Sequence, residues 1–149
     1  MAEQLNNNLY EKCSFGRVEE VREALAAGAD PNTWVGPFST TCLMMAAAWN
    51  QDGMVELLLS TPGIQVNAKS RNNGTALHRA CYNGSAAIIG MISSSPGVQL
   101  NERDNYGWTP IMWAIRARQT PAVIQMASLP DVDLDVKEQG RSLEEFANR

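Results

Sequence analysis

Apolar and polar positions along this chain recur in segments that repeat one another at a spacing of 34 residues. The central segment, residues 67–102, opens with a polar turn and continues with a short apolar helical pattern over residues 75–81, which Asn83-Gly84 breaks. A second apolar helix follows around residues 88–92, and the segment closes on Pro-Gly-Val-Gln-Leu-Asn. A fixed period of this length is typical of a solenoid, in which each unit is one supersecondary structure.

Both ends of the central segment have counterparts in the units before and after it. The stretches that begin at Thr41, Thr75 and Thr109 align without a gap, and so do the tails 62–67, 96–101 and 130–135. Apolar residues at spacings of three and four predict helices on one buried face. The predicted helices span residues 9–15, 18–25, 42–49, 53–60, 75–81 and 88–92, with two more beginning near residues 110 and 121.

The sequence Thr-x-Leu-His-x-Ala at residues 75–80, with Asn83-Gly84, an aliphatic helix and a Val/Leu-Asn close, resembles the ankyrin repeat. That repeat is a turn plus two helices at a period of about 33 residues with a T-P-L-H-x-A core. The resemblance covers nearly the whole chain and implies an all-α fold, an ankyrin-repeat solenoid of stacked helix-turn-helix units with projecting turns. It implies one complete domain over residues 1–149, divided into an N-terminal capping unit (1–33), three repeats (34–67, 68–101 and 102–135) and a C-terminal capping helix (136–149) that starts with a Ser142–Glu145 capping box.

Several positions depart from the pattern of the family. The turn before Thr41 is one residue longer than its counterparts and has Ser39 in place of Gly, so we expect a different shape there. Its two aromatic residues, Trp34 and Phe38, either cover the edge of the capping unit or form a contact site. Asn73 also replaces a Gly, and we expect it at positive φ. Because Gln125 stands where Leu is usual, we expect the helix from residue 121 to be short or frayed.

Composition and charge exclude several classes of function. The net charge is −4, the pI is near 5.0 and no basic run appears, which argues against nucleic-acid binding. No apolar stretch approaches the length of a membrane span, and the first residues do not form a signal peptide. The three cysteines are an odd number at unrelated spacing, which indicates free thiols in a reducing compartment, the cytoplasm or the nucleus.

No arrangement typical of catalysis appears in the sequence. There is no Gly-rich phosphate loop, no cluster of metal ligands and no nucleophile–base set, so we expect no catalytic residue, no cofactor and no metal. His78 is the only histidine, and we assign it to structural hydrogen bonding, as the resemblance implies. Asp131, Asp133 and Asp135 alternate in a way that could suggest calcium, but a solvated turn is the better interpretation. The chain is therefore not expected to be an enzyme.

The resemblance implies a surface for protein binding, because ankyrin domains generally bind proteins through their turn tips and the exposed face of their first helices. The residues at these positions are mainly Trp, Tyr, Met and Arg, which are enriched in interface cores and hot spots. None of them is Lys or an acidic residue. They are Phe38, Met45, Trp49, Arg71, Asn72, Arg79, Tyr82, Asn105, Tyr106, Trp108, Trp113 and Arg116. An alternative is that Trp108 and Trp113 only pack on neighbouring repeats.

The leading hypothesis is a non-catalytic module that binds one protein partner on its concave face and turn tips. A second hypothesis is self-association into a homo-oligomer through the same apolar stripe. A third is a substrate-recruiting fragment of a larger adaptor or enzyme. A fourth is an engineered ankyrin scaffold, since aromatic residues and Met replace the favoured residues of the family at several surface positions.

Overall fold

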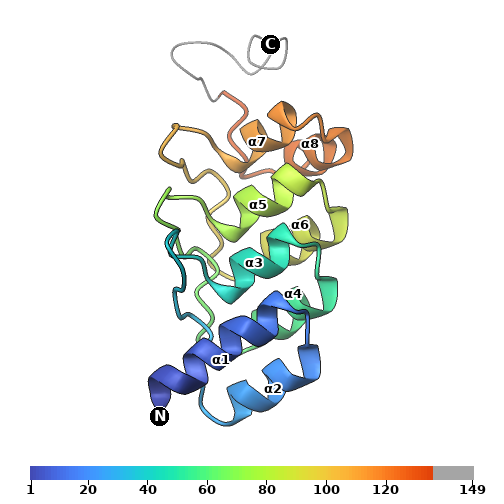
Figure 1. The fold of residues 1–149 in the computed structure, drawn as a ribbon. Helices are drawn as coiled ribbons and strands as arrows, with labels where there is room; N and C mark the ends of the chain where they lie inside the picture. The colour runs from blue at the N-terminus through green and yellow to red at the C-terminus, as the bar shows by residue number, and fades with distance from the viewer. Residues whose placement is uncertain (136–149) are drawn as a thin grey trace.

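The computed structural model describes residues 1–135, and this part of the chain contains eight helices and no strand. The helices are α1 (Ala2–Ser14), α2 (Val18–Ala26), α3 (Cys42–Ala48), α4 (Asp52–Leu59), α5 (Ala76–Asn83), α6 (Ala86–Ser93), α7 (Pro110–Arg116) and α8 (Thr120–Ala127). Figure 1 shows α1, α3, α5 and α7 stacked in one layer and α2, α4, α6 and α8 in a second layer behind them. This arrangement confirms the predicted all-α solenoid of helix-turn-helix units.

Each helix pair is joined by a corner in which one residue adopts a left-handed conformation. The four residues are Gly16 (φ 67°), Asn50 (φ 55°), Gly84 (φ 72°) and Arg118 (φ 55°), each 34 positions after the last. A residue with positive φ ends the first helix and redirects the chain into the second. The corner is thus conserved in geometry across the units even where Asn or Arg replaces Gly.

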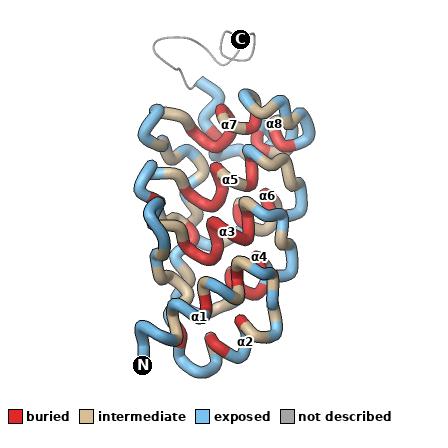
Figure 2. Tube along the Cα trace, in the orientation of Figure 1, coloured by how far each residue is buried: buried red, intermediate tan, exposed pale blue. Residues whose placement is uncertain are grey.

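The core lies between the two layers and runs without interruption along the stack. Leu43, Leu77 and Ile111 occupy equivalent positions in successive first helices and are almost completely buried, as predicted. The alanines three residues further on, Ala46, Ala80 and Ala114, are fully buried and small enough to allow close approach of neighbouring helices. Figure 2 shows buried positions along the helices and exposed positions along the projecting turns.

Two helices differ from their predicted extents. Helix α1 begins at Ala2, well before the predicted start at residue 9. The prediction missed its first turns because they are mostly exposed and carry little apolar pattern. Helix α8 has eight residues, the same length as α4 and α6, so the expectation of a short helix was wrong. Gln125 is accommodated because its Nε2 donates a hydrogen bond to the Ala86 carbonyl of the preceding unit at 2.9 Å.

The longer turn before Thr41 differs in shape from its counterparts, as expected, because it contains a second residue with positive φ, Gly36 at 77°. Val35 and Thr40 exchange two backbone hydrogen bonds of 3.0 Å, which close the extra residue into the loop. Ser39 has a φ of 50°, and the residue in the equivalent position of the third unit, Asn73, has a φ of 59°, as predicted. Trp34 and Phe38 are 55% and 59% exposed, which favours their availability for contact over the interpretation that they cover the edge of the capping unit.

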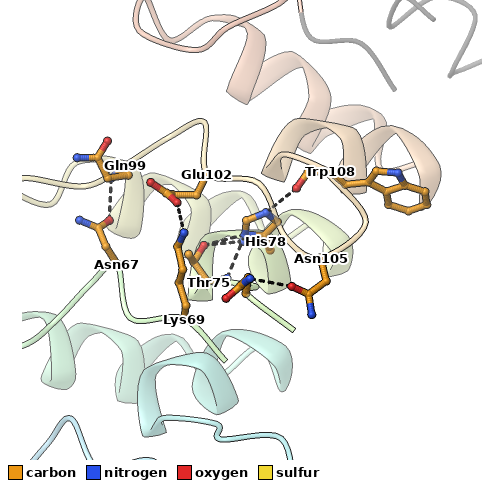
Figure 3. Close-up of polar contacts among 9 residues, drawn as sticks. Asn67, Lys69, Thr75, His78, Gln99, Glu102, Asn105 and Trp108 are labelled. Carbon is orange, nitrogen blue, oxygen red and sulfur yellow. Dashed lines mark hydrogen bonds and ion pairs between the residues drawn. The ribbon is translucent and has the colours of Figure 1, made fainter. Parts of the chain in front are cut away.

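An asparagine ladder connects the tails of successive units. The Asn67 side chain donates to the Gly97 carbonyl at 2.8 Å and accepts from the Gln99 amide at 2.7 Å, the latter visible in Figure 3. Asn32 makes the same two bonds to the tail of the second unit, and Asn101 makes them to the tail of the fourth. Each of these residues therefore satisfies two backbone groups of the next unit.

The division of the chain into five units stays a prediction. The expected capping helix over residues 136–149, with its Ser142–Glu145 capping box, lies outside the described residues. Within residues 1–135, no helix has both the length and the apolar character to cross a bilayer.

Candidate protein-binding groove

His78 fixes the turn of the fourth unit to the first helix of the third. The Thr75 amide donates to Nδ1 at 3.0 Å, and Nε2 lies 2.9 Å from the Trp108 carbonyl oxygen, the contacts drawn in Figure 3. A ring that accepts at Nδ1 and donates at Nε2 is neutral. Burial lowers the pKa of His78 from its ordinary value, and the hydrogen bond to the Trp108 carbonyl raises the pKa by a smaller amount. The predicted structural role of His78 is therefore confirmed.

The projecting turns and the first helices α3, α5 and α7 enclose an open groove of about 650 Å³. Its lining brings together six of the twelve residues predicted for protein binding: Trp49, Asn72, Arg79, Tyr82, Tyr106 and Trp113. The remaining lining residues are Ala48, Ser70, Gly74, His78, Asn83 and Asp104. A groove of this volume accepts a few side chains of a partner, not a whole domain.

Four aromatic rings cluster beside the groove at the fourth unit, and three of them, Tyr82, Tyr106 and Trp113, line it. The Trp113 ring packs edge-to-face on Trp108, with ring centroids 4.7 Å apart, and on Tyr82, with centroids 5.7 Å apart. Tyr106 lies 5.7 Å from Trp108 and 6.4 Å from Trp113 between centroids. Trp108 and Trp113 are partly buried in this cluster, as the alternative interpretation expected, but Trp113 still lines the groove. The cluster joins side chains of the third and fourth units.

Asp104 holds this cluster in place and was missed by the sequence analysis. One carboxylate oxygen accepts from the Trp113 Nε1 at 2.6 Å, and the other accepts from the amides of Tyr106 and Trp108, each at 3.0 Å. Asp104 therefore adds an acidic residue to a surface whose predicted residues include none. An Asp that leads into a turn ending in Gly commonly accepts hydrogen bonds from the turn amides, and this local signal could have revealed the residue.

Arg79 is the only Lys or Arg among the residues that line the groove. Within residues 1–135 its guanidinium has neither a hydrogen bond nor an ion pair. Burial lowers the pKa of Arg79 from its ordinary value, while the charge of Tyr10 raises it. Arginine nevertheless stays protonated in proteins, so the groove contains one permanent cation.

The other predicted residues have different positions. Phe38, Arg71 and Asn105 are exposed at the turn tips, where the Arg71 amide donates to the Phe38 carbonyl at 2.9 Å. The Arg116 guanidinium lies over the Trp108 ring, 5.7 Å from the centroid. Met45 is not on this surface: it is only 8% exposed, and its sulfur accepts a hydrogen bond from the Ser14 hydroxyl at 3.0 Å. Met45 occupies the position equivalent to Arg79 and Trp113, which do line the groove, but α1 packs on α3 and buries it.

Comparison with known proteins identifies the repeat. Residues 43–92 match the family model described as ankyrin repeats (many copies). This part of the chain consists of ankyrin repeats. It is also 40% identical over 87 residues to the Ankyrin repeat and KH domain-containing protein mask-1 of Caenorhabditis elegans. This alignment covers 58% of the chain but 3% of that relative, so the chain spans a small part of the length of the protein it matches.

Ankyrin repeats are in general protein–protein interaction modules. In this ankyrin chain, the residues with potential chemistry near the groove are already engaged. Both ring nitrogens of His78 and both carboxylate oxygens of Asp104 have hydrogen-bond partners. No group of three or more metal-ligating side chains occurs in the described part of the chain. The Asp133 carboxylate accepts from the Asp135 amide at 2.9 Å, which is the arrangement of a turn.

The cysteines of this ankyrin domain are free and buried. Burial raises the pKa of Cys81 to about 12. The hydrogen bond with Cys42, followed by burial, raises the pKa of Cys13 well above its ordinary value. Since the thiolate is the nucleophile, thiols with raised pKa values are unreactive. These side chains act as small packing residues.

Proposed function

We propose that this chain is a non-catalytic ankyrin module that binds one protein partner through the groove and the neighbouring turn tips. The observation that carries the proposal is the set of aromatic side chains around one groove, three of which are largely exposed: Trp49 (70%), Tyr82 (53%) and Tyr106 (71%). Large exposed aromatic side chains around a concave surface are typical of interface hot spots. The partner would bury them, which supplies the apolar part of the binding free energy.

The absence of a catalytic function is part of the proposal. It is supported by the engagement of His78 and Asp104 in hydrogen bonds that hold the fold, which leaves neither free to act as a general base. The free thiols support a location in the cytoplasm or the nucleus, where disulfides are rare. No membrane or nucleic-acid partner is part of the proposal.

The test compares proteins captured by the immobilised chain with those captured by a double variant, Trp49→Ala with Tyr82→Ala. Both side chains are exposed, so we expect the variant to fold with an unchanged thermal midpoint and to lose the partner. Ile124→Ala is the matched control, because Ile124 is 65% exposed on α8 in the other layer of helices and does not line the groove. Equal capture by the double variant and by the wild type would reject the groove as the binding surface.

Self-association through the same surface is distinguished by light scattering across a range of concentrations. A monomeric mass at all concentrations is expected if the groove serves a different protein. A mass that doubles with concentration in the wild type, but not in the Trp49→Ala/Tyr82→Ala variant, would assign the groove to a homodimer instead.

A further inference from the structure

The turns and first helices of the third and fourth units, which contribute most of the groove, carry a net positive charge, although the whole chain is acidic. The turns and first helices there, residues 68–83 and 102–118, contain six of the twelve Lys and Arg residues of the chain and two of its sixteen acidic residues. The six cations are Lys69, Arg71, Arg79, Arg103, Arg116 and Arg118, and the two acids are Glu102 and Asp104. Such a concentration of one sign creates a local potential that attracts an oppositely charged partner.

Neither acidic residue neutralises the cation inside the groove. Glu102 forms an ion pair with Lys69, which Figure 3 shows, and the Asp104 carboxylate accepts from the Trp113 indole and from two turn amides. Arg79 remains partly buried without an ion pair among the described residues. A carboxylate is the natural partner of a guanidinium in such a position, since it can accept two parallel hydrogen bonds from the planar group.

We infer that the groove receives an acidic segment of the protein partner, with one side-chain carboxylate on Arg79 and a neighbouring apolar side chain on Trp49 and Tyr82. This inference rests on the proposed function and adds the chemistry of the partner to it. A cationic side chain is a poor occupant of the groove, because Arg79 repels it and the Asp104 carboxylate is already occupied by three N–H donors. The volume of about 650 Å³ suits two or three side chains of an extended peptide.

The experiment selects peptides from a random twelve-residue phage library on the immobilised full chain. We expect the recovered peptides to be enriched in Asp or Glu next to a large apolar residue, and their binding to require Trp49 and Tyr82. The affinity of one recovered peptide is then measured for wild type, Arg79→Gln, Arg79→Lys and Arg22→Gln. Arg22→Gln removes the same charge from an exposed position on α2, where Arg22 contacts Glu19.

Loss of the carboxylate–guanidinium pair is expected to weaken binding roughly 30-fold or more for Arg79→Gln. Replacement of the peptide carboxylate by its amide should weaken binding by a similar factor, and the two changes together should cost little more than either alone. Arg79→Lys should recover part of the affinity because it keeps the charge, and Arg22→Gln should change it by less than about twofold. A thermal unfolding curve for each variant verifies that it is folded.

Two results overturn the inference, and they are distinguishable from failure of the proposed function. The acidic segment is rejected if the recovered peptides need Trp49 and Tyr82 but are basic or purely apolar. It is also rejected if such a peptide binds Arg79→Gln and wild type with the same affinity. In both cases the proposed binding function remains. Peptides whose binding is unchanged in the Trp49→Ala/Tyr82→Ala variant, or a library that yields no groove-dependent peptide, reject the groove itself.

Discussion

The single histidine of the chain connects two units only while its ring is neutral. Nδ1 of His78 accepts from the Thr75 amide, so a proton on Nδ1 would place two donors against each other. Burial, the largest cause, lowers the pKa of His78 from 6.5, while the Trp108 carbonyl and the nearby charges of Asp104 and Glu102 raise it by smaller amounts. The folded state therefore takes up this proton less readily than the unfolded state.

A pH-dependent stability follows from this depressed pKa. Above a pH of about 6.5 the ring is neutral in both states, and its full contribution to stability is present. As pH falls below that value the unfolded state gains the proton first, so the free energy of unfolding decreases. We expect this decrease between pH 7.5 and 5.5 in urea titrations of the wild type, and a smaller one in His78→Gln, which cannot be protonated. His78→Gln should also lose about 1–3 kcal/mol at pH 7.5. Identical pH dependence in the two proteins would refute this account.

Among structural elements, the corner between the two helices of a unit offers a matched pair of tests. Arg118 is exposed and has a φ of 55°, a conformation that costs a residue with a Cβ atom about 1 kcal/mol. Gly84 holds the same corner in the preceding unit with a φ of 72°, and a Cβ atom there would lie 2.4 Å from the Gln119 Oε1. We expect Arg118→Gly to raise the free energy of unfolding by about 0.5–1 kcal/mol.

Placing a side chain at the equivalent corner of the preceding unit should have the opposite effect on stability. Gly84→Ala should lower the free energy of unfolding by about 1–2 kcal/mol, because it adds both the unfavourable φ and the contact with Gln119. Differential scanning calorimetry measures both variants against the wild type. Destabilisation by Arg118→Gly would show that the Arg118 side chain makes a contribution larger than the backbone strain.

The helices were largely predictable because each repeats the same apolar spacing and the same turn residues. The pattern failed at α1, whose exposed first turns carry no apolar signal, and at α8, where a tertiary hydrogen bond from Gln125 compensates for a missing Leu. The candidate groove was predictable only in part. Residue type suggested its aromatic side chains, but the burial of Met45 depends on how α1 packs on α3, and the role of Asp104 depends on the orientation of Trp113. Such properties arise between units, so a repeat pattern does not reveal them.

At the scale of the whole molecule, the stack is held together by interfaces between nearest neighbours. The asparagine ladder makes this explicit, since Asn32 joins the first unit to the second and Asn67 joins the second to the third through identical pairs of hydrogen bonds. Stability of such a stack is approximately a sum of unit and interface contributions. Loss of the same two hydrogen bonds should therefore have different consequences at the end of the stack and in its middle.

Replacing Asn67 by Ala removes two hydrogen bonds, which we expect to cost about 1–2 kcal/mol at a central interface. Because α3–α4 and α5–α6 then lose part of their mutual support, hydrogen exchange monitored by mass spectrometry should become faster in both helix pairs. Asn32→Ala removes the same two bonds at the end of the stack, so faster exchange should be confined mainly to α1 and α2. An equal increase along all eight described helices in both variants would show that the stack unfolds as one unit, contrary to a nearest-neighbour description. The two variants differ only in position, so any difference between their exchange patterns measures how far a local loss spreads along the stack.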